Sequence, residues 1–142
     1  MTAQPPMRSR PWPAVNEDTQ FFWDGLREGE LRIQRCSQCA SQFHPPKPRC
    51  STCGSFDLGY AVASGRGVVY SHVTFHKPMP SGFDGPYNVS LVDLEEGVRL
   101  VTQVVGVSPE AVRIGLPVAL EITEIDEGLW LPLFRPTQQD GE

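Results

Sequence analysis

Four cysteines in two Cys-x-x-Cys pairs constrain this 142-residue chain more than any other feature of its sequence. The pairs begin at Cys36 and Cys50, ten residues lie between them, and together they contain every cysteine of the chain. Zinc prefers four tetrahedral ligands, and two such turns supply four thiolates. The spacing therefore predicts one structural Zn²⁺ ion, held by Cys36, Cys39, Cys50 and Cys53. Four thiolates close the coordination shell, so no position is left for a catalytic water.

Two disulfides or a redox-active pair are the alternative interpretations of these cysteines. A reducing cytoplasm disfavours disulfides, and a thioredoxin-type motif needs only one pair, set between a strand and a helix. His44 lies between the pairs and is an alternative ligand, although four cysteines already complete the set. Gly54 follows the second pair, where such a turn commonly needs a positive φ. Ala40 occupies the equivalent place after the first pair, which predicts a less regular turn there.

The segment before the cysteines predicts an arm and a short helix. Residues 1–15 contain four prolines and no periodicity, which indicates an arm that is disordered or ordered by a partner. Asp18 or Thr19 is expected to cap a helix that runs to about Glu28 and ends at Gly29. Large apolar side chains would project over more than one face of so short a helix. We therefore predict a partner interface there, formed by Phe21, Phe22, Trp23 and Leu26. The alternative is that all of them pack internally.

From residue 65 onward the pattern changes to β-strands separated by turn signals. Five segments are rich in Val, Ile, Leu and aromatic residues: Arg66–His76, Tyr87–Leu94, Val98–Val105, Pro117–Ile125 and Leu129–Phe134. Gly97 and Gly128 end two three-residue hairpin loops, and residues 108–115 carry the capping residues of a short helix. Five strands with a helix between the third and fourth are typical of an OB-fold barrel. An SH3-like barrel is the alternative, but it usually lacks that helix.

These patterns predict a mostly β protein, with an N-terminal helix and zinc ribbon followed by a five-stranded OB-fold barrel. The predicted boundaries are 1–30 for the arm and helix, 31–60 for the ribbon, 61–136 for the barrel and 137–142 for a tail. Residues 31–34 alternate like a first ribbon strand, and residues 60–65 are expected to link the ribbon to the barrel.

The formal net charge of −5 is distributed unevenly along the chain. Residues 27–77 carry a net charge of +4, whereas the chain from Asp84 onward carries −8. An acidic barrel disfavours nucleic acid as a partner, while a basic ribbon suits one small phosphorylated ligand. No apolar run approaches the length of a transmembrane helix and no secretory signal is present, so we expect no membrane partner and a cytoplasmic location.

No residue of this chain is predicted to be catalytic. His72 and His76 share one face of a predicted strand, but their positions are about 13 Å apart, too far for them to act on one bond. The glycine-rich segment 64–67 precedes a strand, so it lacks the helix dipole that binds phosphate. The acidic pairs at residues 95–96 and 126–127 lie at hairpin tips, where solvated charge is the ordinary situation.

Several motifs, taken in order, resemble those of a known family. They are Phe22-Trp23, residues 31–36 leading into the first cysteine pair, Pro45-Pro46, residues 50–55 and residues 64–71. From about Thr19 to Pro136, the chain is similar to the acyl-CoA-associated family that joins a rubredoxin-like zinc ribbon to an OB-fold, long catalogued as a domain of unknown function. Ala40 departs from the glycine that is usual in the family.

The resemblance implies a companion subunit of a thiolase-like enzyme. Relatives associate with acyltransferases and with retro-aldolases that shorten steroid side chains, stabilise them and help to form their acyl-CoA channel. We therefore expect a thiolase-like partner, an acyl-CoA ligand and one structural Zn²⁺. The side chains expected to face the phosphates of CoA are basic: Arg35, Lys47, Arg49 and Arg66. The alternatives are a nucleic-acid-binding protein, a stand-alone acyl-CoA binder or an unrecognised hydrolase.

Overall fold

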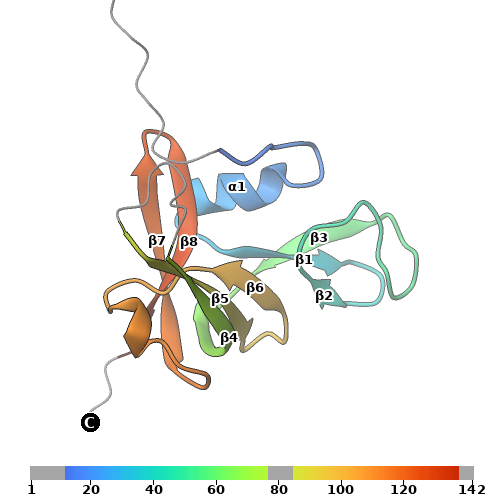
Figure 1. Cartoon of the computed structure of the whole chain (residues 1–142). Helices are drawn as coiled ribbons and strands as arrows, with labels where there is room; N and C mark the ends of the chain where they lie inside the picture. The colour runs from blue at the N-terminus through green and yellow to red at the C-terminus, as the bar shows by residue number, and fades with distance from the viewer. Residues whose placement is uncertain (1–11, 77–84, 138–142) are drawn as a thin grey trace, which may run out of the picture.

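The computed structural model describes residues 12–76 and 85–137, which form a small three-stranded sheet, one helix and a five-stranded barrel (Figure 1). The small sheet has the order β2-β1-β3, and the barrel sheet has the order β6-β5-β4-β7-β8. The elements are α1 (Gln20–Arg27), β1 (Arg32–Cys36), β2 (Gln42–Phe43), β3 (Leu58–Val62), β4 (Arg66–Phe75), β5 (Tyr87–Leu94), β6 (Arg99–Thr102), β7 (Pro117–Asp126) and β8 (Leu129–Pro136). The predicted architecture of a helix and ribbon followed by an OB-like barrel is confirmed.

Helix α1 begins and ends close to the predicted residues, but side-chain capping occurs in the turn that precedes it. Thr19 is the N-cap and makes no side-chain cap hydrogen bond. The side-chain oxygen of Asn16 instead accepts hydrogen bonds from the backbone N–H groups of Asp18 (2.9 Å) and Thr19 (3.1 Å). Gly29 adopts a φ of 82° and ends the helix, as expected of a glycine at this position.

The end of the predicted arm packs on the barrel. Trp12 Nε1 donates a hydrogen bond to Asp126 Oδ2 at 3.3 Å, at the tip of the β7–β8 hairpin. Trp12, Trp23 and Trp130 line one small hollow of about 60 Å³ between the arm, α1 and β8. The prediction of an arm that is disordered or ordered by a partner is therefore corrected for residues 12–15, which pack against this chain itself. Residues 1–11 and the tail from 138 lie outside the described residues.

The barrel bends at β4, a long strand that carries a β-bulge and pairs with two neighbours. β4 runs alongside β5 over its whole length, with a bulge at Tyr70, and its first three residues also pair with β7. At the other side of the barrel, Phe134 closes the seam between β6 and β8. Its N–H donates to Gln103 O (3.1 Å), and its C=O accepts from Val105 N (2.7 Å).

The helix predicted over residues 108–115 is only one 3₁₀ turn, at Pro109–Ala111. Val112 follows in an extended conformation (φ −78°, ψ 132°), which ends the helix, and its side chain is buried in the core. The linker predicted at residues 60–65 is also shorter than expected. β3 continues to Val62, where it pairs with Arg32 of β1.

One hydrophobic core joins the helix, the ribbon and the barrel. Phe22 and Leu26 of α1 pack with Leu31 and Ile33 of the ribbon and with a larger set from the barrel. The barrel members include Val69, Val92, Leu100, Val104, Val118 and Phe134. Because the core is shared, the position of the ribbon is fixed by the same contacts that stabilise the barrel. Within the described residues, no helix has the length and apolar character needed to cross a membrane.

Candidate metal centre

The four cysteines converge at the end of the ribbon opposite the barrel. Their sulfur atoms all lie within 4.8 Å of one another, and two pairs are closer, Cys36–Cys53 and Cys39–Cys50, each at 3.6 Å. A tetrahedral zinc site with Zn–S bonds near 2.3 Å places its sulfurs about 3.8 Å apart. The cluster therefore fits one structural Zn²⁺, as predicted. The cysteines are not disulfide-bonded, and His44 is not part of the cluster.

The two cysteine turns are built in the same way. In the first turn, Cys36 N donates to Ser41 O (2.9 Å) and Ala40 N donates to Cys36 O (2.9 Å). In the second turn, the equivalent bonds join Cys50 N to Ser55 O (2.8 Å) and Gly54 N to Cys50 O (2.9 Å). Each turn also directs a backbone N–H at the sulfur of its first cysteine, from Gln38 (3.4 Å) and from Thr52 (3.3 Å). Such N–H groups stabilise thiolates, which are the form that binds metal.

The negative charges of the cysteine thiolates favour a bound cation. Hydrogen bonds from the N–H groups of Cys53 and Thr52 lower the pKa of Cys50 to about 6. The N–H of Ser55 also lowers the pKa of Cys53, but the neighbouring sulfur of Cys36 and burial outweigh it and raise that pKa to about 12. Four thiolates this close repel one another, and a divalent cation supplies the compensating charge.

Ala40 has a left-handed backbone conformation, with a φ of 67°. Its counterpart Gly54 has a φ of 81°, so both turns need the conformation that glycine adopts without strain. For a residue with a Cβ, this conformation costs about 1–2 kcal/mol. The first turn therefore has the same hydrogen bonds as the second. The irregularity that the sequence predicted is confined to the strained backbone of Ala40.

We expect Ala40→Gly to stabilise the zinc-loaded protein by about 0.5–1 kcal/mol, because relief of strain exceeds the entropy that glycine adds to the unfolded chain. Urea unfolding with excess zinc measures the change. Gly54→Ala is the reverse substitution and should lower the free energy of unfolding by at least a similar amount, because a Cβ there would also lie 2.8 Å from the Arg49 guanidinium. A lower midpoint for Ala40→Gly, by the amount expected from the added entropy of the unfolded chain alone, would show that the turn is unstrained.

The basic residues predicted to face CoA differ in their surroundings. Arg35, Lys47 and Arg49 are exposed on the ribbon, and none forms an ion pair with a described residue. Arg49 lies over the ring of Phe56, 5.0 Å from its centroid. Arg66, in contrast, forms a bidentate ion pair with Glu95 (2.7 and 3.0 Å) at the start of β4. Its charge is balanced within the chain.

A shallow groove of about 390 Å³ lies beside Lys47, between the start of α1 and the ribbon. Phe21 stacks on Tyr60 along one wall (5.8 Å between centroids), and Phe56, which is 72% exposed, lines another part. Gln34 fixes the loop that carries Lys47, because its side chain both accepts from Lys47 N (2.6 Å) and donates to Lys47 O (2.9 Å). Phe56 and Tyr60 were not among the predicted site residues, and Phe21 was predicted only for the partner interface.

The helix residues predicted at a partner interface have mixed surroundings. Phe22 and Leu26 are 5% and 1% exposed and belong to the shared core, so they offer almost no surface to a partner. Phe21 and Trp23 are only partly buried, so the predicted partner interface stays a prediction for these two residues. Trp23 makes an edge contact with Phe22 (5.1 Å) and therefore also contributes to the fold.

His44 is partly buried against Phe22, with 5.1 Å between the ring centroids. Burial lowers the pKa of His44 to about 4, so its imidazole is neutral at physiological pH. Its Nδ1 has no hydrogen-bond partner in the described structure. These surroundings are those of a packing residue, and they agree with the absence of His44 from the cysteine cluster.

A zinc ribbon followed by an OB-like barrel thus defines the class of this protein. Residues 23–59 match the family described as the ChsH2 rubredoxin-like zinc ribbon domain, and residues 60–123 match the ChsH2 C-terminal OB-fold domain. A solved chain of the "Ltp2-ChsH2(DUF35) aldolase" is 47% identical, with a TM-score of 0.85, over 87% of this chain and 98% of that chain. The chain belongs to the DUF35 family of ChsH2-type proteins.

Relatives of known name fall into two groups. A probable enoyl-CoA hydratase alpha subunit of Thermomonospora curvata is 47% identical over 99% of this chain and 44% of its own length. The 3-oxo-4,17-pregnadiene-20-carboxyl-CoA hydratase alpha subunit of Mycobacterium tuberculosis is 44% identical over 83% of this chain and 37% of its own length. A DUF35 domain-containing scaffold protein of Pyrococcus furiosus is 33% identical over 81% of this chain and 90% of its own length. The chain therefore spans less than half of the two hydratase subunits.

Proposed function

We propose that this chain is a non-catalytic companion subunit of a thiolase-like enzyme that acts on acyl-CoA thioesters. The observation that carries the proposal is its similarity to the ChsH2(DUF35) chain of an aldolase named together with Ltp2, at 47% identity over 98% of that chain. The scaffold protein of Pyrococcus furiosus, which this chain matches over 90% of its length, supports a structural rather than a catalytic role.

The chemistry of the metal centre supports the absence of catalysis by this chain. Four cysteine ligands saturate a tetrahedral Zn²⁺, so the ion cannot also bind and activate a water. What the zinc supplies is folding free energy for the ribbon. The chain's own residues would then position the partner and help to form its acyl-CoA site.

For the reaction, we propose carbon–carbon bond cleavage by the partner in the degradation of a steroid side chain. The similar solved structure is that of a protein named as an aldolase, and the name of one relative contains a pregnadiene-carboxyl-CoA. Acyl transfer is the alternative. The hydratase activity in the relatives' names is not carried over, because the chain spans less than half of those proteins. A cytoplasmic location fits both CoA chemistry and four reduced cysteines.

For CoA, we propose phosphate contacts by Arg35, Lys47 and Arg49, whose charges no described carboxylate neutralises. The aromatic groove beside Lys47 would then lie next to the bound nucleotide. Arg66 is left out because Glu95 balances its charge. Phe21, in the wall of that groove, and Trp23 remain candidates for contact with the partner.

We expect Lys47→Glu to raise the KM of the assembled enzyme for an acyl-CoA by about threefold to tenfold, because an exposed contact to phosphate contributes roughly 1 kcal/mol. The kcat should change little, since a contact to the phosphates of CoA leaves the reacting thioester group untouched. Arg113→Glu makes the same change of charge at an exposed site on the barrel and serves as the matched control. Steady-state kinetics at low salt measures both variants. If the two variants have the same KM, the proposed contact between the ribbon and CoA is wrong.

The decisive experiment compares the activity of this chain alone, of Ltp2 alone and of the two together, with a CoA thioester as substrate. We expect no turnover by this chain alone and a clear gain when it is added to Ltp2. Turnover of the thioester by this chain at a rate that Ltp2 does not increase would contradict the companion role and require an active site within the chain.

A further inference from the structure

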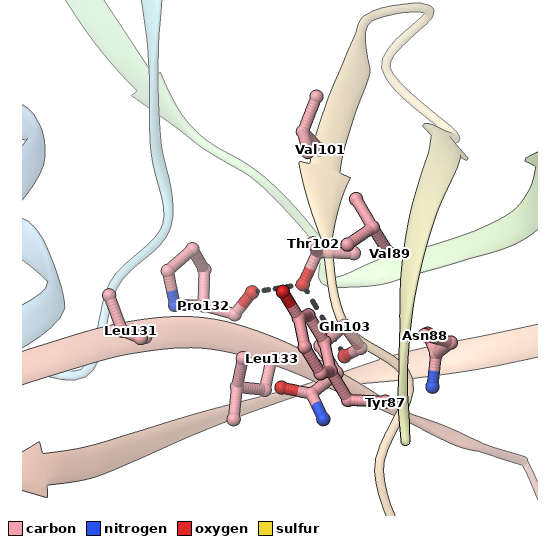
Figure 2. Close-up of a pocket in the computed structure, with 9 residues that line it drawn as sticks. All are labelled: Tyr87, Asn88, Val89, Val101, Thr102, Gln103, Leu131, Pro132 and Leu133. Carbon is pink, nitrogen blue, oxygen red and sulfur yellow. Dashed lines mark hydrogen bonds between the residues drawn. The ribbon is translucent and has the colours of Figure 1, made fainter. Parts of the chain in front are cut away.

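A second groove lies on the seam of the barrel and shares no lining residue with the groove beside Lys47. It has a volume of about 230 Å³ and is walled by residues from the start of β5, the end of β6 and the middle of β8 (Figure 2). The lining side chains are mostly apolar and include Tyr87, Val89, Val101, Leu131 and Leu133. That volume corresponds to about seven or eight water molecules of the liquid. A large apolar side chain that entered the groove would displace this water.

The groove exists because the seam cannot close at Pro132. Two residues further along β8, Phe134 exchanges backbone hydrogen bonds with residues 103 and 105. The nitrogen of Pro132 points to the same side of the strand but has no hydrogen to donate. Among the described residues, the hydroxyl of Thr102 reaches across and donates to Pro132 O at 2.6 Å (Figure 2). The strands therefore separate at this point and leave the apolar walls open to solvent.

The groove continues into an apolar strip on the outer face of the sheet. The strand register places Val73 beside Val89, Phe75 beside Tyr87, and Leu91 beside Val101. Paired residues of antiparallel strands point to the same face, so these six side chains form one surface. Three of them are strongly exposed: Val101 (64%), Val73 (52%) and Phe75 (45%). Phe75 also stacks on Tyr87, with 5.3 Å between the rings. A contiguous apolar surface of this kind marks an interaction site.

The charge of this surface decides which kind of partner it fits. None of the six residues of the apolar strip is charged, and the next pair along the strands, Asp93 and Arg99, is joined by an ion pair at 2.6 Å. OB-folds that bind nucleic acids use the same face, that of their second and third strands, which here are β5 and β6. A polyanion would find no free cation among the six residues, whereas an apolar protein surface would bury them.

We propose that the apolar strip and the seam groove are the docking surface for the thiolase-like subunit, and that this subunit inserts a large apolar side chain into the groove. The inference rests on the proposed function, in which such a subunit is the partner. A second copy of this chain fits less well. Two copies would bring together halves that each carry a net charge of −8 from Asp84 onward, and like charges oppose that contact.

Val101→Glu tests the surface, with Ltp2 as the binding partner. A charge buried at the centre of the interface should raise the Kd for Ltp2 by at least about 30-fold, the change typical of a hot-spot residue. Ile114→Glu is the matched control, because Ile114 is 71% exposed, is equally apolar and lies outside the strip. We expect its Kd to stay within about threefold of the wild type. Titration calorimetry gives both constants, and thermal melting verifies that each variant is folded. Val73→Glu, at the other side of the strip, should weaken binding in the same way.

Three results would overturn the inference, and they are distinguishable. If the wild type binds Ltp2 and Val101→Glu binds equally well, the surface is wrong while the proposed function stands. If the wild-type chain does not bind Ltp2 at all, the proposed function fails, and the assignment of this surface fails with it. If the wild type alone is a dimer in sedimentation analysis and Val101→Glu is a monomer, the surface belongs to a second copy of the chain.

Discussion

Loss of the zinc ion is expected to unfold the ribbon and to leave a protein that cannot assemble. Cys50→Ser should bind far less than one equivalent of zinc, because a neutral hydroxyl replaces a thiolate in a shell of four. Structural zinc sites of this type contribute about 10–16 kcal/mol of apparent binding free energy, more than a domain of this size can lose. Metal analysis and far-UV circular dichroism measure the loss of metal and of structure.

Ser51→Ala is the control for that substitution. Ser51 is exposed next to Cys50 and provides no ligand, so this variant should keep one zinc ion and its melting temperature. Acidification should mimic the loss of Cys50, since protons compete with zinc for the thiolates. A zinc-free Cys50→Ser protein that melts like the wild type would contradict the structural role of the metal.

Leu26→Ala is expected to destabilise the whole chain by about 3 kcal/mol. Leu26 is 1% exposed and belongs to the core that joins α1, the ribbon and the barrel, so its truncation leaves a cavity at their junction. For a protein of this length, the change lowers the melting temperature by about 10 °C. Differential scanning calorimetry of the zinc-loaded protein measures it.

Gln20→Ala, on the exposed side of the same helix, should change the free energy of unfolding by less than about 0.5 kcal/mol. A small loss for Leu26→Ala, comparable to that of the control, would mean that the helix is dispensable for the core. In that case, the helix would be free to serve the partner as the sequence alone predicted.

The features that sequence analysis located correctly are those set by local chemistry. The cysteine spacing identifies the metal centre because each pair forms its own turn. Gly97 and Gly128 mark the two hairpins because both tight loops require a positive φ, here 91° and 86°. Likewise, Gly29 marks the end of α1. In each case, a few neighbouring residues contain the whole signal, and tertiary contacts only confirm it.

The features that sequence analysis missed depend on residues far apart in the chain. Nothing near Arg66 indicates that Glu95, 29 residues later, balances its charge. The i, i+4 spacing of Phe22 and Leu26 places them on one face of α1, but it does not say whether that face packs against the core of the same chain or against a partner. The seam groove is assembled from three separate strands, so it becomes visible only when β6 and β8 are placed side by side. Pro132 is its one local signal, and a proline within a strand also marks an edge.

The three tryptophans that line the hollow beside α1 provide an intrinsic fluorescence probe of this region. They are all the tryptophans of the chain, so its entire indole emission comes from one place. Excitation near 295 nm would follow the attachment of the helix and arm to the β7–β8 hairpin. The aromatic residues of the seam groove and of the ribbon groove are phenylalanine and tyrosine, which that wavelength barely excites. A shift of the emission on mixing with a partner would therefore report contact at the helix and arm, or a rearrangement that reaches them.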